Sequence, residues 1–83
     1  MEIYGHILHQ IKALRIIPSL RVKAGDLGGW IEKEENLSQE DDAWVSDGAQ
    51  VHDNVRVFSN AWVYGNARVY GNARVFGNAR VFQ

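Results

Sequence analysis

The sequence predicts an all-β protein in which short parallel strands stack on one another as a solenoid. Valine recurs every six residues, a small apolar residue stands two positions before nearly every one of these valines, and pairs such as Gly-Asn separate the repeats. A period of six is not helical, and a fixed period is the signature of a repeat architecture. The repeating valines are Val45, Val51, Val57, Val63, Val69, Val75 and Val81.

Each six-residue repeat, or hexad, is expected to form one short strand. From residue 60 the chain runs NAWVYG, NARVYG, NARVFG and NARVFQ. Because alternate residues of a strand share a face, alanine and valine lie on one face while arginine and the aromatic residue lie on the other. Glycine and asparagine then break the strand, since both tolerate a positive φ. The small residues are Ala43, Ala49, Val55, Ala61, Ala67, Ala73 and Ala79, of which only Val55 is larger than alanine.

An antiparallel meander with Gly-Asn hairpins is excluded by its register. A two-residue turn at Gly65-Asn66 would place Val63 opposite Arg68, and opposite residues lie on the same face of a sheet. Every valine would then share its face with an arginine, so neither face would be dry. Parallel stacking instead buries every valine and alanine of the repeat.

The hexads resemble those of the left-handed parallel β-helices, the hexapeptide-repeat proteins. In that family three hexads form one triangular coil, so the resemblance implies coils of three hexads, whereas the period alone would also allow two-sided coils of two hexads. The pattern covers about residues 30–83, which implies about three coils. The side chains expected to stack are Phe58 under Phe76, Tyr64 under Phe82, and Trp44, Trp62 and Arg80 in one column.

Residues 1–29 are predicted to form an N-terminal cap on this β-helix, within a single domain overall. The end of a solenoid exposes core side chains and unpaired backbone groups, so it needs a cover. Residues 7–17 are rich in isoleucine and leucine and are interpreted as a capping strand or hairpin. A helix stays open as the alternative, because the apolar residues from Ile3 to Leu14 also fit one helical face. Pro18 should end either element.

The N-terminal half carries a second resemblance. The segments IKAL at 11–14, VKAGDLGGWI at 22–31 and ENLSQ at 35–39 are similar to the start of small hexapeptide-repeat proteins of phages and prophages. Most of that group is functionally uncharacterised. The resemblance therefore implies a phage origin and says little about activity.

Length and composition narrow the classes of protein that fit. The chain has 83 residues and no cysteine, which predicts one domain with a small core, no disulfide and no cysteine-based metal site. Its apolar runs fall far short of the roughly 18 residues of a membrane helix, and its start does not read as a secretory signal. We therefore expect a cytoplasmic protein of the host cell with no membrane partner. The net charge of −1 does not favour direct nucleic-acid binding.

Charge is unevenly distributed along the chain. Residues 26–53 hold nine acidic residues and one lysine, whereas residues 54–83 hold four arginines and no acid. Such runs are usually solvated surface, but carboxylates spaced along a rigid rod could also imitate a DNA backbone. The second interpretation predicts an anti-CRISPR-like inhibitor of a host nucleic-acid-binding defence complex. The acidic partner surface would comprise Glu32, Glu34, Glu35, Glu40, Asp41, Asp42, Asp47 and Asp53.

The C-terminal hexad is predicted to be a site of self-association. It is as regular as those before it, and no capping segment follows it. An open strand edge can pair with another chain. We therefore expect a homo-oligomer, and among the possible oligomers we expect a dimer. The alternatives are that the last hexad frays and that stacked aromatic residues only stiffen the ladder. The predicted interface residues are Phe58, Trp62, Tyr64, Phe76, Arg80, Val81 and Phe82.

No catalytic residue, cofactor or metal ligand is predicted. His6 and His9 form a His-x-x-His pair, but on a strand they would point to opposite faces and could not share an ion. His52 follows Val51 and should point out of the coil, without the orienting partner and pocket that a general base needs. The glycine-rich stretch at 25–29 lacks the residues of a phosphate loop and reads as a turn. The sequence therefore predicts a non-enzymatic, phage-derived β-helix module that self-associates and binds a host or phage protein.

Overall fold

The computed structural model describes residues 1–83 and confirms an all-β chain without an α-helix. Two short 3-10 helices, η1 (Pro18–Leu20) and η2 (Glu34–Asn36), interrupt the strands. Neither helical segment has the length and hydropathy that a membrane crossing demands. The strands are β1 (Glu2–Ile3), β2 (His6–Ile7), β3 (His9–Lys12), β4 (Leu27–Ile31), β5 (Trp44–Val45), β6 (Gln50–Val51), β7 (Arg56–Val57), β8 (Trp62–Tyr64), β9 (Arg68–Val69), β10 (Arg74–Val75) and β11 (Arg80–Phe82).

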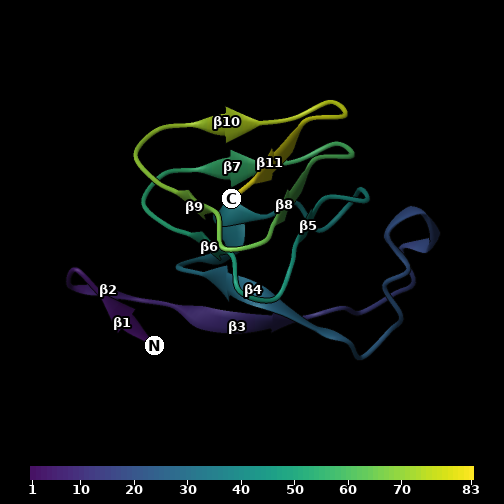
Figure 1. The fold of residues 1–83 in the computed structure, drawn as a ribbon, viewed down its shortest axis with the longest axis horizontal. Helices are drawn as coiled ribbons and strands as arrows, with labels where there is room; N and C mark the ends of the chain where they lie inside the picture. Colours follow the sequence, from purple (N-terminus) through teal and green to yellow (C-terminus); the bar gives the residue numbers. More distant parts are fainter.

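Most strands pair in parallel with the strand three hexads away. β5, β8 and β11 lie in one sheet, β6 pairs with β9, and β7 pairs with β10. The register places Val63 between Val45 and Val81. In Figure 1, β10 lies above β7 and β11 near β8, so successive turns of the chain are stacked along one direction. This spacing is the one that the resemblance to hexapeptide-repeat proteins implies for neighbouring strands, and it is not the spacing of two hexads that the period alone would also allow.

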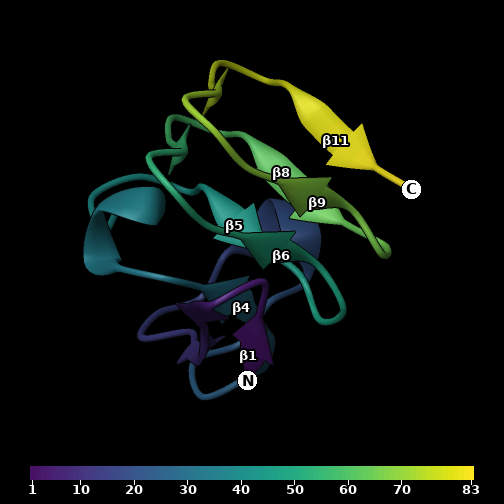
Figure 2. The same ribbon diagram turned by 90° about the vertical axis from the view of Figure 1, so that its left-hand side faces the viewer.

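The spacing is wider at the start of the stack. Ile31 of β4 pairs with Val51, and Leu37 bridges Val57, so both pairs are separated by two residues more than three hexads. A uniform spacing of three hexads from residue 30 onward is therefore wrong for this first turn. The two additional residues fall between Leu37 and Val45, where the acidic segment 39–42 departs from the hexad pattern. Figure 2 shows β4, β6 and β9 at successive levels of the stack.

The core consists of the small and aliphatic residues that the hexad pattern places on one face. Val45, Val51, Val55 and Val63 are completely buried, and they belong to one cluster of 13 residues. Burying a valine side chain contributes about 1.5–3 kcal/mol, so these stacked aliphatic residues are a major source of stability. The arginines of the hexads lie on the opposite face and are exposed, as the alternation of side chains along a strand predicts.

Turns between the hexads use the left-handed backbone conformation. Gly65, Gly71 and Gly77 have φ values of 67°, 79° and 65°, which glycine adopts without a steric penalty. Asp53 and Ser59 occupy the same turn position in earlier repeats and take φ values of 63° and 61°. A non-glycine residue in this conformation is uncommon and is worth a closer look.

The N-terminal segment is a strand, not a helix. β1 and β2 form an antiparallel hairpin across residues 4 and 5, and β3 pairs antiparallel with β4. β3 thereby covers the edge of β4 that faces away from β6. The glycine-rich stretch is only partly a turn: Gly25 has φ 94°, but Gly28 and Gly29 lie inside β4. A Cβ on Gly28 would lie 2.6 Å from the Trp44 ring, so this close packing requires glycine.

Candidate functional site

The outer side of β9, β10 and β11 is a strand edge without a partner, here called the free edge. Each of these strands lies at the end of its sheet. The backbone carbonyls of Ala67, Ala73 and Ala79 accept hydrogen bonds from the preceding turn. Because successive peptide groups of a strand point to opposite edges, the peptide groups of the intervening residues, such as Arg74, point away from the stack. The free edge therefore offers hydrogen-bonding groups to another strand.

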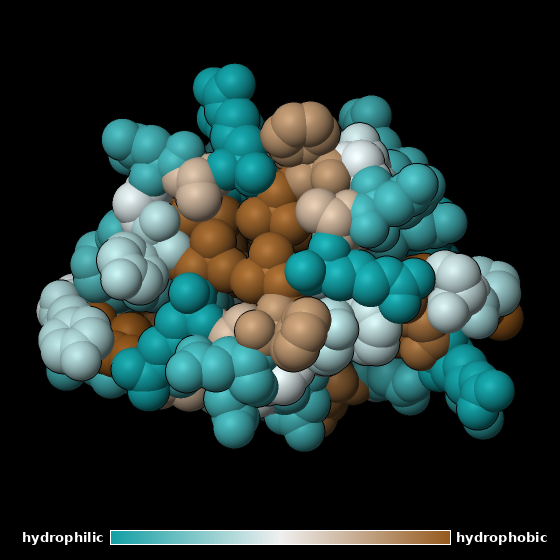
Figure 3. All heavy atoms as spheres, turned by 45° about the horizontal axis from the view of Figure 1, so that its top comes forward, coloured by the Kyte–Doolittle hydropathy of each residue, from teal (hydrophilic) through white to brown (hydrophobic).

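Apolar side chains accompany the free edge. Ala73 and Ala79 are exposed and Val81 is half-buried, although their counterparts in earlier turns are fully buried. Phe76 and Phe82 are 57% and 66% exposed. Figure 3 shows the apolar atoms gathered in a hollow on this end of the molecule, with hydrophilic residues around it. The core layer is thus open to solvent at the C-terminal end of the stack.

Two of the aromatic pairs expected to stack do so on the outer faces, whereas Trp44 is buried against Ala13, Ile17 and Val22 of the N-terminal segment. Phe58 stacks on Phe76 with ring centroids 5.3 Å apart, and Tyr64 stacks on Phe82 at 5.1 Å. The guanidinium of Arg80 lies 5.5 Å from the centre of the Trp62 ring, a cation–π contact worth about 0.5–1 kcal/mol at an exposed site. Five of the seven predicted interface residues lie on the paired strands β8 and β11: Trp62, Tyr64, Arg80, Val81 and Phe82. The other two, Phe58 and Phe76, directly follow β7 and β10.

The predicted acidic surface is divided among several environments. Glu34, Glu35, Glu40 and Asp47 are exposed. The carboxylate of Asp42 pairs with Arg15 at 3.2 Å. The remaining three carboxylates are engaged by the fold: Asp41 accepts a hydrogen bond from the backbone of Ser59, and Glu32 and Asp53 lie together beside two histidines.

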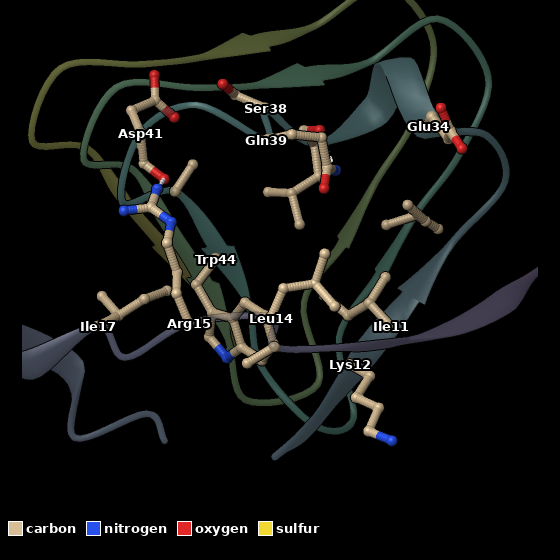
Figure 4. A pocket seen from close by; sticks show the side chains of 14 residues that line it. Ile11, Lys12, Leu14, Arg15, Ile17, Glu34, Ser38, Gln39, Asp41 and Trp44 are labelled. Carbon is tan, nitrogen blue, oxygen red and sulfur yellow. Dashed lines mark hydrogen bonds between the residues drawn. The ribbon is translucent and has the colours of Figure 1, made fainter. Parts of the chain in front are cut away.

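A groove near Trp44 separates β3 from the acidic segment. It has a volume of about 380 Å³ and is lined mainly by apolar residues, which come from β3, β4, β5 and the segments that follow β3 and β4. In Figure 4 the side chains of Ile11 and Leu14 point toward its centre, and Arg15 reaches across toward Asp41. The N-terminal strand therefore covers the first turn of the stack only in part.

His6, Glu32, His52 and Asp53 form a compact group, here called the His–carboxylate cluster. One ligand-type atom of each residue lies within 4.8 Å of those of the others. The imidazole of His6 contacts both carboxylates, with Nδ1 2.8 Å from Glu32 Oε2 and Nε2 3.1 Å from Asp53 Oδ1. His52 Nδ1 lies 3.1 Å from the same Asp53 oxygen.

Three separate segments bring the cluster together. His6 comes from the N-terminal hairpin, Glu32 directly follows β4, and His52 and Asp53 follow β6. The rings of His6, His52 and Tyr70 form a column, with centroids 4.7 Å and 5.8 Å apart. The hairpin covers His52, which is only 6% exposed. The expectation that His52 points out of the core is correct, but its side chain is not open to solvent.

Charge stabilises the cluster as observed. The hydrogen bond with Glu32 raises the pKa of His6, and the negative charges of Glu32 and Asp53 raise it further. Burial of the ring opposes this rise. The hydrogen bond from His6, and a second from the backbone of Asp53, lower the pKa of Glu32. The backbone N–H of Gly71 and the side chain of His52 lower the pKa of Asp53. The protonated, positively charged form of His6 is therefore favoured between the carboxylates of Glu32 and Asp53.

The strand pattern argues against a site shared by His6 and His9, and it does not indicate that His6 meets His52. His9 is exposed on β3 and is not part of the cluster, whereas His6 meets residues more than twenty positions away. No periodic signal connects the hairpin to the turn after β6. The one available signal is that Asp53 stands where later repeats carry glycine, since a non-glycine residue at a left-handed turn often has a functional reason.

No known protein family matches the chain, and no curated protein or solved structure is similar to it. The free edge and the His–carboxylate cluster are therefore the features that point to a function.

Proposed function

We propose that the chain is a non-enzymatic interaction module that forms a dimer through its free edge. In this proposal, the residues from about 30 to 83 form a left-handed parallel β-helix of about three triangular coils, and residues 1–29 form its N-terminal cap. The parallel pairing at a spacing of three hexads, the aliphatic core cluster of 13 residues and the stacked outer aromatic residues support this architecture. A phage origin, which follows from the sequence resemblance, and a cytoplasmic location are parts of the same proposal.

The single observation that carries the proposed function is the one-sided pairing of β9, β10 and β11. An edge strand presents unpaired N–H and C=O groups that another strand can match. Two copies related by a two-fold axis present the same edge to each other, so the interface is self-complementary. The exposed Ala73, Ala79, Phe76 and Phe82 add apolar area at this edge, and their burial would favour association.

Electrostatic repulsion between the two basic ends opposes this association. Arg68, Arg74 and Arg80 lie on the last three strands, and residues 66–83 contain no acidic side chain. Two such ends that approach each other repel electrostatically, and salt screens that repulsion. We therefore expect the dimer to become tighter as the ionic strength rises, which distinguishes it from an association of the acidic segment of one copy with the basic end of another.

A direct test is sedimentation equilibrium of the full chain with one variant at the free edge and a matched control. Ala79→Lys adds a fourth cation to the exposed end, whereas Ala24→Lys places the same change on the exposed N-terminal side. The proposal predicts a dimer for the native chain and for Ala24→Lys, and a monomer for Ala79→Lys. A native chain that stays monomeric at all concentrations, or a dimer that Ala79→Lys leaves intact, overturns it.

The binding of a host or phage protein by this module is a further part of the proposal. The alternative function, an anti-CRISPR-like inhibitor with an acidic DNA-mimicking surface, stays a hypothesis. It has no structural observation in its favour, because Glu32, Asp41, Asp42 and Asp53 are engaged within the chain and do not join one open surface.

A further inference from the structure

We propose that the His–carboxylate cluster binds one divalent transition-metal ion of the zinc type, with His6 Nε2, His52 Nδ1 and Asp53 Oδ1 as its ligands. The inference is independent of the proposed self-association, because the cluster lies beside the N-terminal hairpin and not at the free edge. Two imidazoles and one carboxylate are a donor set that suits Zn²⁺ and related ions, and does not suit Mg²⁺ or Ca²⁺, which prefer oxygen.

The spacing of each histidine nitrogen from the Asp53 carboxylate fits a metal site. Both histidine nitrogens lie 3.1 Å from Asp53 Oδ1. In a tetrahedral zinc site with bonds of about 2.0–2.1 Å, neighbouring ligand atoms are about 3.3 Å apart. These two separations are close to that edge length.

The backbone at Asp53 makes this arrangement possible. Successive residues of a strand point to opposite faces, so His52 and Asp53 could not both reach one ion in an extended conformation. The φ of 63° at Asp53 turns its carboxylate back beside the His52 ring. The other carboxylate oxygen, Oδ2, accepts a hydrogen bond of 2.9 Å from the N–H of Gly71, which fixes the orientation of the group.

Glu32 has the position of an orienting residue behind a metal ligand. Its Oε2 lies 2.8 Å from His6 Nδ1, and its Oε1 accepts a hydrogen bond of 2.7 Å from the backbone of Asp53. Metal-bound histidines usually donate their second ring N–H to a carboxylate, which sets the tautomer and the ring orientation. Glu32 would thus leave Nε2 of His6 free to bind the ion.

Space for further ligands lies next to the cluster. A hollow of about 450 Å³ has no hydrophobic residue in its lining, which includes His6, Glu32 and Asp53. A fourth position could therefore be filled by water or by a small anion. The ion would connect the N-terminal hairpin to the turn after β6, and metal binding is one of the devices by which small domains gain stability.

The test is calorimetric titration of Zn²⁺ into the untagged full chain after treatment with a chelator. We expect one ion per chain, and weaker binding by at least tenfold in His6→Gln and in Asp53→Asn. Asparagine tolerates the left-handed conformation of residue 53 and can keep the hydrogen bond from Gly71, so the second variant separates loss of the ligand charge from loss of the turn. His9→Gln is the matched control, because His9 is an exposed histidine outside the cluster, and it should bind as tightly as the native chain.

A second readout uses Co²⁺ as the probe. The visible absorption of Co²⁺ in a four-coordinate site should appear with the native chain and His9→Gln and be absent with His6→Gln. Glu32→Gln should bind more weakly by about 10–100-fold, as is typical for an orienting carboxylate, and should retain the absorption at saturation. The proposal is overturned if Zn²⁺ does not bind, if it binds as tightly to His6→Gln as to the native chain, or if Mg²⁺ binds equally well.

Discussion

The side-chain amide of Asn36 donates a hydrogen bond of 2.9 Å to the backbone carbonyl of Val55. Asn36 is completely buried. It donates a second bond to the carbonyl of Asp53, and its oxygen accepts bonds from the backbones of Glu32 and Lys33. One side chain thus joins the segment after β4 to the turn after β6, and it places Glu32 next to Asp53.

Replacing Asn36 should be among the most destabilising polar substitutions in the chain. Asn36→Ala leaves several backbone groups unpaired in the interior, and each buried unpaired group costs about 1–3 kcal/mol. We expect a loss of at least about 3 kcal/mol in the free energy of unfolding, measured by urea denaturation. Asn78→Ala is the control: Asn78 is exposed and accepts only a long bond of 3.5 Å from Asn60, so its loss should stay within about 0.5 kcal/mol. Equal losses in the two variants would contradict the role given to Asn36.

The position of a valine in the stack should decide how much its truncation costs. Val63 is completely buried between Val45 and Val81, whereas Val81 is half-buried at the free edge. Val63→Ala removes two buried carbon atoms and leaves a cavity, for an expected loss of about 2–3 kcal/mol. Val81→Ala should cost about 1 kcal/mol or less in the monomer. Thermal and urea unfolding of both variants at low protein concentration measures the difference, and a larger loss for Val81→Ala would show that this edge is covered.

Ser59 and Gly77 allow a reciprocal test of the turns. They stand three hexads apart at equivalent positions, with φ values of 61° and 65°. Ser59→Gly should stabilise the chain and Gly77→Ser should destabilise it, each by about 1 kcal/mol, because only glycine adopts this conformation without a penalty. A Cβ at residue 77 would meet no atom within 4 Å, so the change reports the backbone alone. Changes of the same sign in both variants would refute the equivalence of the two turns.

Arg15 and Asp42 form the one Arg–carboxylate ion pair of the chain, at 3.2 Å. Both side chains are about half exposed, so solvent and salt weaken the attraction. Arg15→Ala should therefore reduce the stability by at most about 1 kcal/mol. The measured loss should shrink further at high salt; a loss that does not change with salt would point to the packing of the arginine stem instead.

The later part of the stack is predictable because each hexad repeats the same pattern and because the resemblance to hexapeptide-repeat proteins implies a spacing of three hexads. Val63 and Val81 become neighbours once three hexads separate them, and the stacking of Phe58 on Phe76 follows from the same spacing. The first turn departs from this rule because two additional residues lie between Leu37 and Val45, and no local preference reveals how a longer segment is accommodated. The wider spacing between Ile31 and Val51 is visible only in the paired backbone.

The His–carboxylate cluster could not be predicted for a different reason. His6 belongs to a hairpin whose position depends on tertiary packing and not on a repeat, so the sequence contains no register that aligns it with His52. The burial of Asn36 is equally hidden, because asparagine at this point of the pattern reads as an ordinary turn residue. The run of acidic residues assigns Asp53 to an open surface, but its neighbours in space are two histidines and the backbone of Gly71.

The most direct test of self-association through the free edge is amide hydrogen exchange of the native chain, resolved by residue and followed as a function of protein concentration. The N–H groups of Arg68, Arg74 and Arg80 lie on strands with one free side, and pairing with a second copy would protect them. The proposed dimer predicts that these amides exchange quickly in dilute solution and become protected as the concentration rises, while Ala79→Lys keeps them unprotected. Fast exchange of the three amides at every concentration, or new protection confined to the acidic segment 39–42, would contradict association through this edge.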